Sequence, residues 1–267
     1  MSISVMIAMI CLLTMLIHCA ETLSYSIRLA GVRTGKLAVS LSLTGILLLV
    51  SRTANMAQSP LAGGLIDLAN QGRDVHVRSA FHWIIGASSV GTLLAMALFP
   101  SCVRLFSRMI QHLEEAGSLP RMISGVTIVQ LKHARSHLRK PRWSMLKSLR
   151  YHGIPYRLFA INTLVTGIYT IGVLAALYAS FSSATAATST SQSSGLINGV
   201  ATILLTVFVD PHLAMLTDKA QRDAEAQGKL GRILGAFMVS RLAGTLLAQL
   251  LFVPAALWIS WIGGMIY

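Results

Sequence analysis

Ionisable and polar side chains near the start of the chain stand at spacings that could do chemistry inside a membrane. His18, Glu21, Tyr25 and Arg28 recur every three or four residues, so a helix would present them on one face. In hydrocarbon such groups are costly, and they normally line a protein interior or a water-filled route. The stretch from residue 18 to residue 67, which ends at Asp67, therefore predicts a functional site.

A second polar stripe follows in the next apolar segment, beside Arg52. Its members are Ser40, Thr44, Ser51, Asn55 and Gln58. If the two stripes face each other, they line a hydrophilic groove, to which Arg241 could add a cation from a distant apolar segment. Arginine forks match phosphate oxygens bidentately, so the groove suits a ligand that carries phosphate. The alternative is a buried structural network in which Glu21 neutralises an arginine.

A basic turn separates the two stripes. Residues 30–36 read AGVRTGK and combine two glycines, a hydroxyl, Arg33 and Lys36 just before a predicted helix. Backbone amides at a helix start attract anions, so the turn is a candidate phosphate site. Its spacing is not that of a Walker motif, and no strand precedes it.

Enzymatic and metal sites are weakly supported. His18 and Glu21 could begin a metal site, but three or four ligands are required and the sequence offers no HExxH motif. Paired catalytic carboxylates and a nucleophile with its base are also missing. The three cysteines lack metal spacing and fit as small apolar fillers. We expect no cofactor, no metal and no enzymatic activity.

Composition places the chain among membrane proteins. Of its 267 residues, 54% are hydrophobic and 12% charged, against about 25% charged in soluble domains. Mean hydropathy is +0.66. The net charge of +13 comes largely from the stretch between residues 104 and 157, which holds eleven Lys and Arg residues. Anionic lipids of the inner leaflet are thus favoured as partners over nucleic acid.

Six segments are long and apolar enough to cross a bilayer as helices. Their approximate ranges are 3–26, 37–58, 81–99, 156–179, 194–209 with an extension, and 233–262. The first lacks a basic start and a cleavage site, which favours a retained span over a signal peptide. The second is uniformly apolar only to Val50, so either Arg52 lies inside the membrane or the helix breaks near Pro60.

Charge asymmetry predicts the orientation. The connections after the first, third and fifth spans carry most of the Lys and Arg, which places them in the cytoplasm and both termini outside. Within the long central connection, residues 104–115 and 123–138 show helical spacing of apolar residues. We expect these amphipathic helices to lie along the inner leaflet.

The two halves of the sequence resemble each other. The run GTLLA recurs at residues 91–95 and 244–248, and each copy is followed by Leu, Phe and then Pro. We divide the chain into residues 1–100, 101–155 and 156–267: three spans, a basic connection and three spans. An odd number of spans per copy inverts the second copy, an arrangement typical of secondary transporters.

The residues from His18 to Asp67 resemble one known family. The elements ETLSYSIRLAGVRTG and SRTANMAQSPL are long and unusual, and they are similar to the signature of the Amj family of bacterial lipid II flippases. The six-span layout extends this resemblance along nearly the whole chain.

The resemblance implies movement of undecaprenyl-pyrophosphate-linked disaccharide-pentapeptide to the outer leaflet of the cytoplasmic membrane for cell-wall synthesis. We expect substrate contacts from the cations and the amide of the groove, and gating or coupling from the remaining ionisable groups. The first set is Arg28, Arg33, Lys36, Arg52, Asn55 and Arg241; the second is His18, Glu21, Tyr25 and Asp67. A small-solute or ion transporter and a membrane-embedded lipid-phosphate hydrolase stay open as alternatives. The oligomeric state is not predicted.

Overall fold

The computed structural model describes residues 2–116, 155–182 and 187–266, and every regular element in these ranges is a helix. The elements in chain order are α1 (Ile3–Thr34), α2 (Leu37–Asn70), α3 (Val77–Ala116), α7 (Tyr156–Ser182), α8 (Ala187–Gln192), α9 (Ser194–Leu204), η1 (Leu205–Val209), α10 (Asp210–Arg222) and α11 (Ala224–Ile266). Six stretches in the described ranges are long and apolar enough to span a membrane. The chain is therefore an all-α polytopic membrane protein, as predicted.

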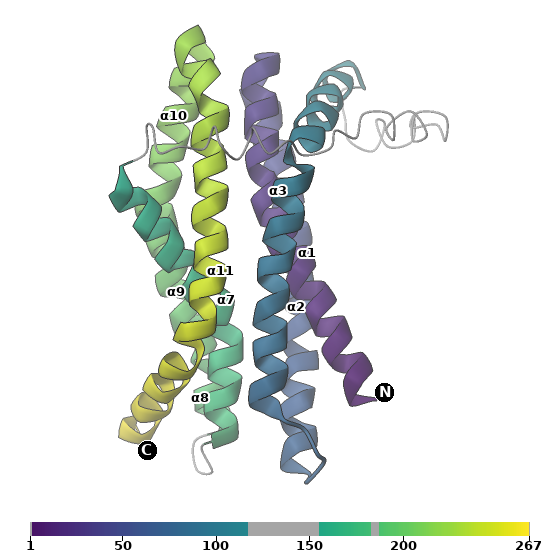
Figure 1. The fold of residues 1–267 in the computed structure, drawn as a ribbon, viewed down its shortest axis with the longest axis vertical. Helices are drawn as coiled ribbons and strands as arrows, with labels where there is room; N and C mark the ends of the chain where they lie inside the picture. The colour runs from purple at the N-terminus through teal and green to yellow at the C-terminus, as the bar shows by residue number, and fades with distance from the viewer. Residues whose placement is uncertain (1, 117–154, 183–186, 267) are drawn as a thin grey trace.

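The helices form two adjacent groups (Figure 1). α1 packs against α2 and α3, whereas α7 packs against α11 and α9. The groups meet mainly where α3 contacts α11, with further contacts of α1 and α2 to the second group. We call α1–α3 the N-terminal half and α7–α11 the C-terminal half. Any group shared between α1 and α11 therefore lies at the junction of the halves.

The long spans run alternately up and down. Both termini lie at one end of the bundle, and the turns between α1 and α2 and between α10 and α11 lie at the other (Figure 1). α3 ends and α7 begins at this second end as well, so the described residues that flank the central connection lie on the same side as these two turns. We call it the basic end, and the opposite one the terminal end.

Local sequence explains where the first helices begin and end. Ser2 caps α1 by accepting a hydrogen bond from the amide of Val5 at 3.4 Å. Gly35 ends it with φ of 70°, a left-handed conformation that glycine adopts without strain. The turn is therefore shorter than predicted. Residues 30–34 continue α1 and their amides take part in the helix, so the prediction that the turn extends over residues 30–36 is wrong.

The second span is a continuous helix despite its polar residues. α2 runs over 34 residues with Pro60 inside it, so the alternative with Arg52 within a span holds. Its counterpart in the C-terminal half is interrupted, with α8, α9, the π-helix η1 and α10 between residues 187 and 222. π-helical turns inside α-helices occur frequently at functional sites.

α3 is longer than the predicted span over residues 81–99. It continues through Ala116, so the segment 104–115 extends α3, and the proposed domain boundary at residue 100 falls within this helix. The predicted amphipathic segment 123–138 lies outside the described residues.

Candidate functional site

A buried ion pair joins the two halves of the bundle. Arg241 on α11 places its Nη2 atom 2.5 Å from Oε2 of Glu21 on α1. The side chains are 9% and 13% exposed, so the pair is nearly sealed from its surroundings. In a low-dielectric interior, removing one partner of such a pair leaves an uncompensated charge that costs about 3–5 kcal/mol.

Hydroxyl groups complete the coordination of the pair. Ser51 on α2 donates to Oε1 of Glu21 at 2.8 Å, and Nε of Arg241 donates to the Thr22 hydroxyl at 3.3 Å. α1 supplies Glu21 and Thr22 from adjacent positions, and its close packing against α2 brings Ser51 within reach. The contributing side chains thus come from α1, α2 and α11.

Three further polar side chains surround the ion pair. His18 and Tyr25 on α1 are 2% and 5% exposed, and each lies in electrostatic range of Arg241. Tyr169 on α7 lies in electrostatic range of Glu21, Arg241 and Arg52. We call Glu21, Arg241, Thr22, Ser51, His18, Tyr25 and Tyr169 the junction cluster.

The sequence analysis does not select Tyr169. This tyrosine lies in an apolar stretch of α7 with no ionisable residue nearby in sequence, so only the packing of α7 reveals its role. The available signal is its position. Tyrosine is usually enriched at the membrane interface, whereas Tyr169 lies at the centre of a span.

The contact between α11 and the N-terminal half continues as a row of polar pairs. Arg241, Thr245 and Gln249 stand four residues apart and so share one face of α11. Ser89 on α3 donates to the Thr245 hydroxyl at 3.0 Å. The side chain of His82 on α3 contacts Oε1 of Gln249 through Nδ1 at 2.6 Å, and Nε2 of Gln249 donates to the carbonyl of His82 at 3.0 Å. We call these two pairs, Ser89–Thr245 and His82–Gln249, the polar row.

The predicted cations of the first connection lie toward the basic end. Arg28 is half-buried, and its Nε atom is buried without a hydrogen-bond partner among the described residues. Its electrostatic neighbours include Tyr25 and Asp210, so it lies between the junction cluster and the interrupted span. Arg33 is exposed, and Lys36 is half-buried immediately before α2.

Side chains from the C-terminal half hold this end of α1. Gln221 donates to the carbonyl of Gly35 at 3.3 Å, and Gln227 donates to the carbonyl of Val32 at 3.3 Å. The first connection is thereby tied to the turn between α10 and α11.

The remaining predicted residues lie around the cluster or away from it. Arg52 is exposed and Asn55 half-buried on α2, within and just beyond the turn that carries Ser51. Asp67 is exposed near the last turn of α2, toward the terminal end, and does not join the junction cluster. The structure therefore brings His18, Glu21, Tyr25 and Arg241 together, with Arg52 close by.

No group of three or more His, Cys, Asp or Glu side chains in the described ranges is arranged to hold a metal ion. The polar groups of the junction cluster present one carboxylate, one guanidinium, one imidazole and several hydroxyls. Such a set can exchange hydrogen bonds with an anionic or sugar-bearing ligand.

Comparison with known proteins assigns the family. Residues 13–263 match the family described as Amj, alternate to MurJ. The chain is also 44% identical over 250 residues to "Lipid II flippase Amj" of Bacillus subtilis (strain 168), and the match covers 93% of each protein. No solved structure matches. With its family signature between His18 and Asp67 and its six membrane-spanning stretches, the chain belongs to the Amj family.

Proposed function

We propose that this protein is a lipid II flippase that moves undecaprenyl-pyrophosphate-linked disaccharide-pentapeptide from the inner to the outer leaflet of the bacterial cytoplasmic membrane. The observation that carries the proposal is the 44% identity, over 93% of both chains, to a protein named for this activity. The protein acts as a transporter: the lipid changes leaflet and no bond is cleaved.

The chemistry of the junction cluster supports the proposal. A flippase must shelter a diphosphate and a sugar–peptide headgroup while the prenyl chain stays in lipid. Arg241 is already paired with a carboxylate, Glu21, at the contact between the halves. A diphosphate that replaced Glu21 on Arg241 would keep the guanidinium paired, so the headgroup itself would release the contact between α1 and α11.

The basic end supports an entry site. We assign it to the cytoplasmic side, since Lys and Arg concentrate in its connections, and both termini then lie outside. Arg28, Arg33 and Lys36 capture the diphosphate there, and anionic lipids contact the basic connections. Arg28 suits the role because its buried Nε atom has no hydrogen-bond partner in the described part of the chain.

Arg52 and Asn55 receive the headgroup deeper in the membrane. Arg52 is exposed within a span and lies in electrostatic range of Tyr169 on the opposite half, so it faces a route that opens sideways toward lipid. His18, Glu21 and Tyr25 gate the route with Arg241. Asp67, exposed at the far end of α2, offers an alternative carboxylate in another state.

Two features support an inverted repeat as the framework of this movement. A Cβ atom added at Gly91 would overlap the Met15 carbonyl oxygen, and one added at Gly244 would overlap the Thr163 carbonyl oxygen, so the matched glycines permit matched close approaches. α3 and α11 each change direction in their C-terminal parts, at opposite ends of the bundle (Figure 1), and contain Pro100 and Pro254. Inverted repeats provide two related ways of opening one site.

The test is reconstitution of the full chain in liposomes that contain lipid II with a fluorescent headgroup. The wild type should make the inner-leaflet headgroup accessible to an external quencher while the lipid stays intact. Arg28→Gln should lower the rate at least roughly tenfold, the loss expected for one charge-assisted contact. Arg222→Gln removes an exposed arginine from the C-terminal half and should leave the rate unchanged.

Hydrolysis of the lipid would favour the membrane-embedded hydrolase, and a wild type that gives no change in accessibility would overturn the proposal. In cells that lack other flippases, Arg28→Gln should also fail to restore growth at normal protein levels.

A further inference from the structure

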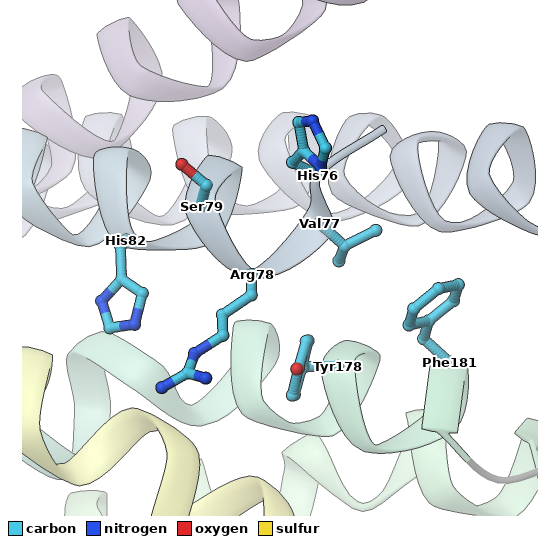
Figure 2. A pocket seen from close by; sticks show the side chains of 7 residues that line it. All are labelled: His76, Val77, Arg78, Ser79, His82, Tyr178 and Phe181. Carbon is cyan, nitrogen blue, oxygen red and sulfur yellow. The ribbon is translucent and has the colours of Figure 1, made fainter. Parts of the chain in front are cut away.

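An open pocket with a mainly apolar lining and a few polar side chains lies at the terminal end of the bundle, away from the junction cluster (Figure 2). Its volume is about 660 Å³, within the usual range for small-molecule sites. His76 immediately precedes α3, whose first turns supply Arg78 and His82; the last turns of α7 supply Tyr178 and Phe181. The cavity thus lies between the two halves.

Arg78 dominates the charge of this cavity. Its side chain extends from α3 toward α7, between His82 and Tyr178 (Figure 2). Within the described ranges its guanidinium takes part in no ion pair or hydrogen bond. The carboxylate closest in sequence, Asp74, is exposed and places its Oδ1 atom 3.7 Å from Nε2 of His76. Arg78 is exposed at the rim of this open pocket, and a guanidinium without such a partner there can bind phosphate oxygens bidentately.

The wall of the cavity is built from fixed aromatic rings. Phe252 of α11 is fully buried, and its ring centroid lies 5.3 Å from the rings of both His82 and Tyr178. Gln249 fixes His82 through two polar contacts. A tyrosine with an apolar body and a polar tip suits a site where a polar headgroup joins a lipid chain.

The polar row leads from the junction cluster to this cavity. Arg241 stands eight residues before Gln249 on α11, which corresponds to about 12 Å along a helix. The last member of the row, His82, lines the cavity. Three exposed tryptophans lie toward the same end of the bundle: Trp83, Trp258 and Trp261. Tryptophan is enriched at membrane interfaces, so this end is expected to lie at one.

From these observations we propose that the cavity is an exit site, which holds the lipid-linked diphosphate on the terminal face after the headgroup has passed the junction cluster. This inference rests on the proposed function. Arg78 binds the diphosphate, and Tyr178 and Phe181 contact the adjoining sugar or the first part of the lipid chain. The exit site is separate from the entry cations Arg28, Arg33 and Lys36, which lie at the basic end.

The test places the photocrosslinking amino acid p-benzoylphenylalanine at Phe181 in the full chain, reconstituted in neutral vesicles with lipid II. We expect a crosslink to lipid II that undecaprenyl diphosphate displaces, whereas inorganic diphosphate and phosphatidylglycerol at the same concentration do not. Adding Arg78→Gln should lower the crosslink roughly tenfold, as expected for the loss of one charge-assisted contact. Arg73→Gln, which removes an exposed arginine from the neighbouring turn, should leave it unchanged.

Several results would overturn the exit site: no crosslink, a crosslink insensitive to Arg78→Gln, or equal displacement by inorganic diphosphate or phosphatidylglycerol. Headgroup accessibility, measured with the wild type in matching vesicles, separates the two proposals. Translocation by the wild type without a crosslink at position 181 overturns the exit site alone, and failure of translocation overturns the proposed function. Thermal unfolding of the Arg78→Gln protein checks that the change is local.

Discussion

The N-terminal and C-terminal halves share packing features and differ in their charges. In each half a glycine of the GTLLA run allows one helix to approach another closely, Gly91 against α1 and Gly244 against α7. The first half, however, contributes a carboxylate to the junction, Glu21, and the second an arginine, Arg241. The two close helix approaches are alike, whereas the charged groups that the halves bring to the junction differ.

The middle span of each half differs most. α2 is a continuous helix that carries Ser51 toward Glu21 and Arg52 outward. The corresponding part of the C-terminal half contains the π-helix η1 and then Pro211 in the first turn of α10. A continuous helix can present a polar stripe as a rigid unit, whereas an interrupted one can change its path. We infer that α2 carries the polar route and that the opposite span accommodates movement.

The largest effect should follow from breaking the charge asymmetry at the junction. Glu21→Gln leaves Arg241 buried without a counter-charge, and the free energy of unfolding should fall by about 3–5 kcal/mol. Thermal or denaturant unfolding of the purified protein measures the loss. Transport in vesicles should fall with it.

The double variant Glu21→Gln with Arg241→Gln separates the charge from the packing. Removing both charges should recover much of the lost stability, because no unpaired ion remains, whereas transport should stay low. A double variant as unstable as the sum of the two single variants would contradict the coupling.

The second effect tests whether the halves are packed alike. Gly91→Ala and Gly244→Ala each place a Cβ against a backbone carbonyl of the neighbouring helix, so each should destabilise by about 1–3 kcal/mol. The controls are Gly63→Ala and Gly199→Ala, one per half, where nothing lies within 4 Å of an added Cβ. These should be neutral or stabilise by about 0.5–1 kcal/mol. If only one of the two variants, Gly91→Ala or Gly244→Ala, lost stability, the two halves would not be packed alike.

A third change tests the support that α2 gives to Glu21. Ser51→Ala removes a 2.8 Å hydrogen bond to a carboxylate, and we expect a loss of about 1.5–3 kcal/mol in unfolding experiments. Ser59→Ala, at an exposed position on the same helix, is the matched control and should change the stability by less than about 0.5 kcal/mol. Equal effects at the two serines would contradict the role assigned to α2.

The sequence predicts the six spans and half of the junction, for identifiable reasons. Apolar length reveals spans, and three- or four-residue spacing places His18, Glu21 and Tyr25 on one face, as the structure confirms. The partner of Glu21 was named only as one of several arginines, because no local rule connects residues 220 positions apart. The end of α1 was misplaced, since the glycine at position 31 is typical of a turn, yet it packs against the Ser40 side chain inside a helix. The polar row depends on helix packing and carries no local signal, and for Tyr169 the signal is limited to its place at the centre of a span.

The smallest effect on stability should come from Arg52, the exposed arginine of the continuous span. Arg52→Gln removes an exposed charge and leaves no buried counter-charge unpaired, so the free energy of unfolding should change by less than about 0.5 kcal/mol. Transport should nevertheless fall roughly tenfold if the headgroup contacts this guanidinium. Arg157→Gln removes an exposed arginine at the first turn of α7, at the end of a span, and should alter neither quantity. The comparison of the two variants in the vesicle assay is decisive, because both lose one exposed charge and only Arg52 lies beside the junction. Equal transport by the two would contradict the role assigned to Arg52, because the guanidinium beside the junction would then matter no more than one at the end of a span.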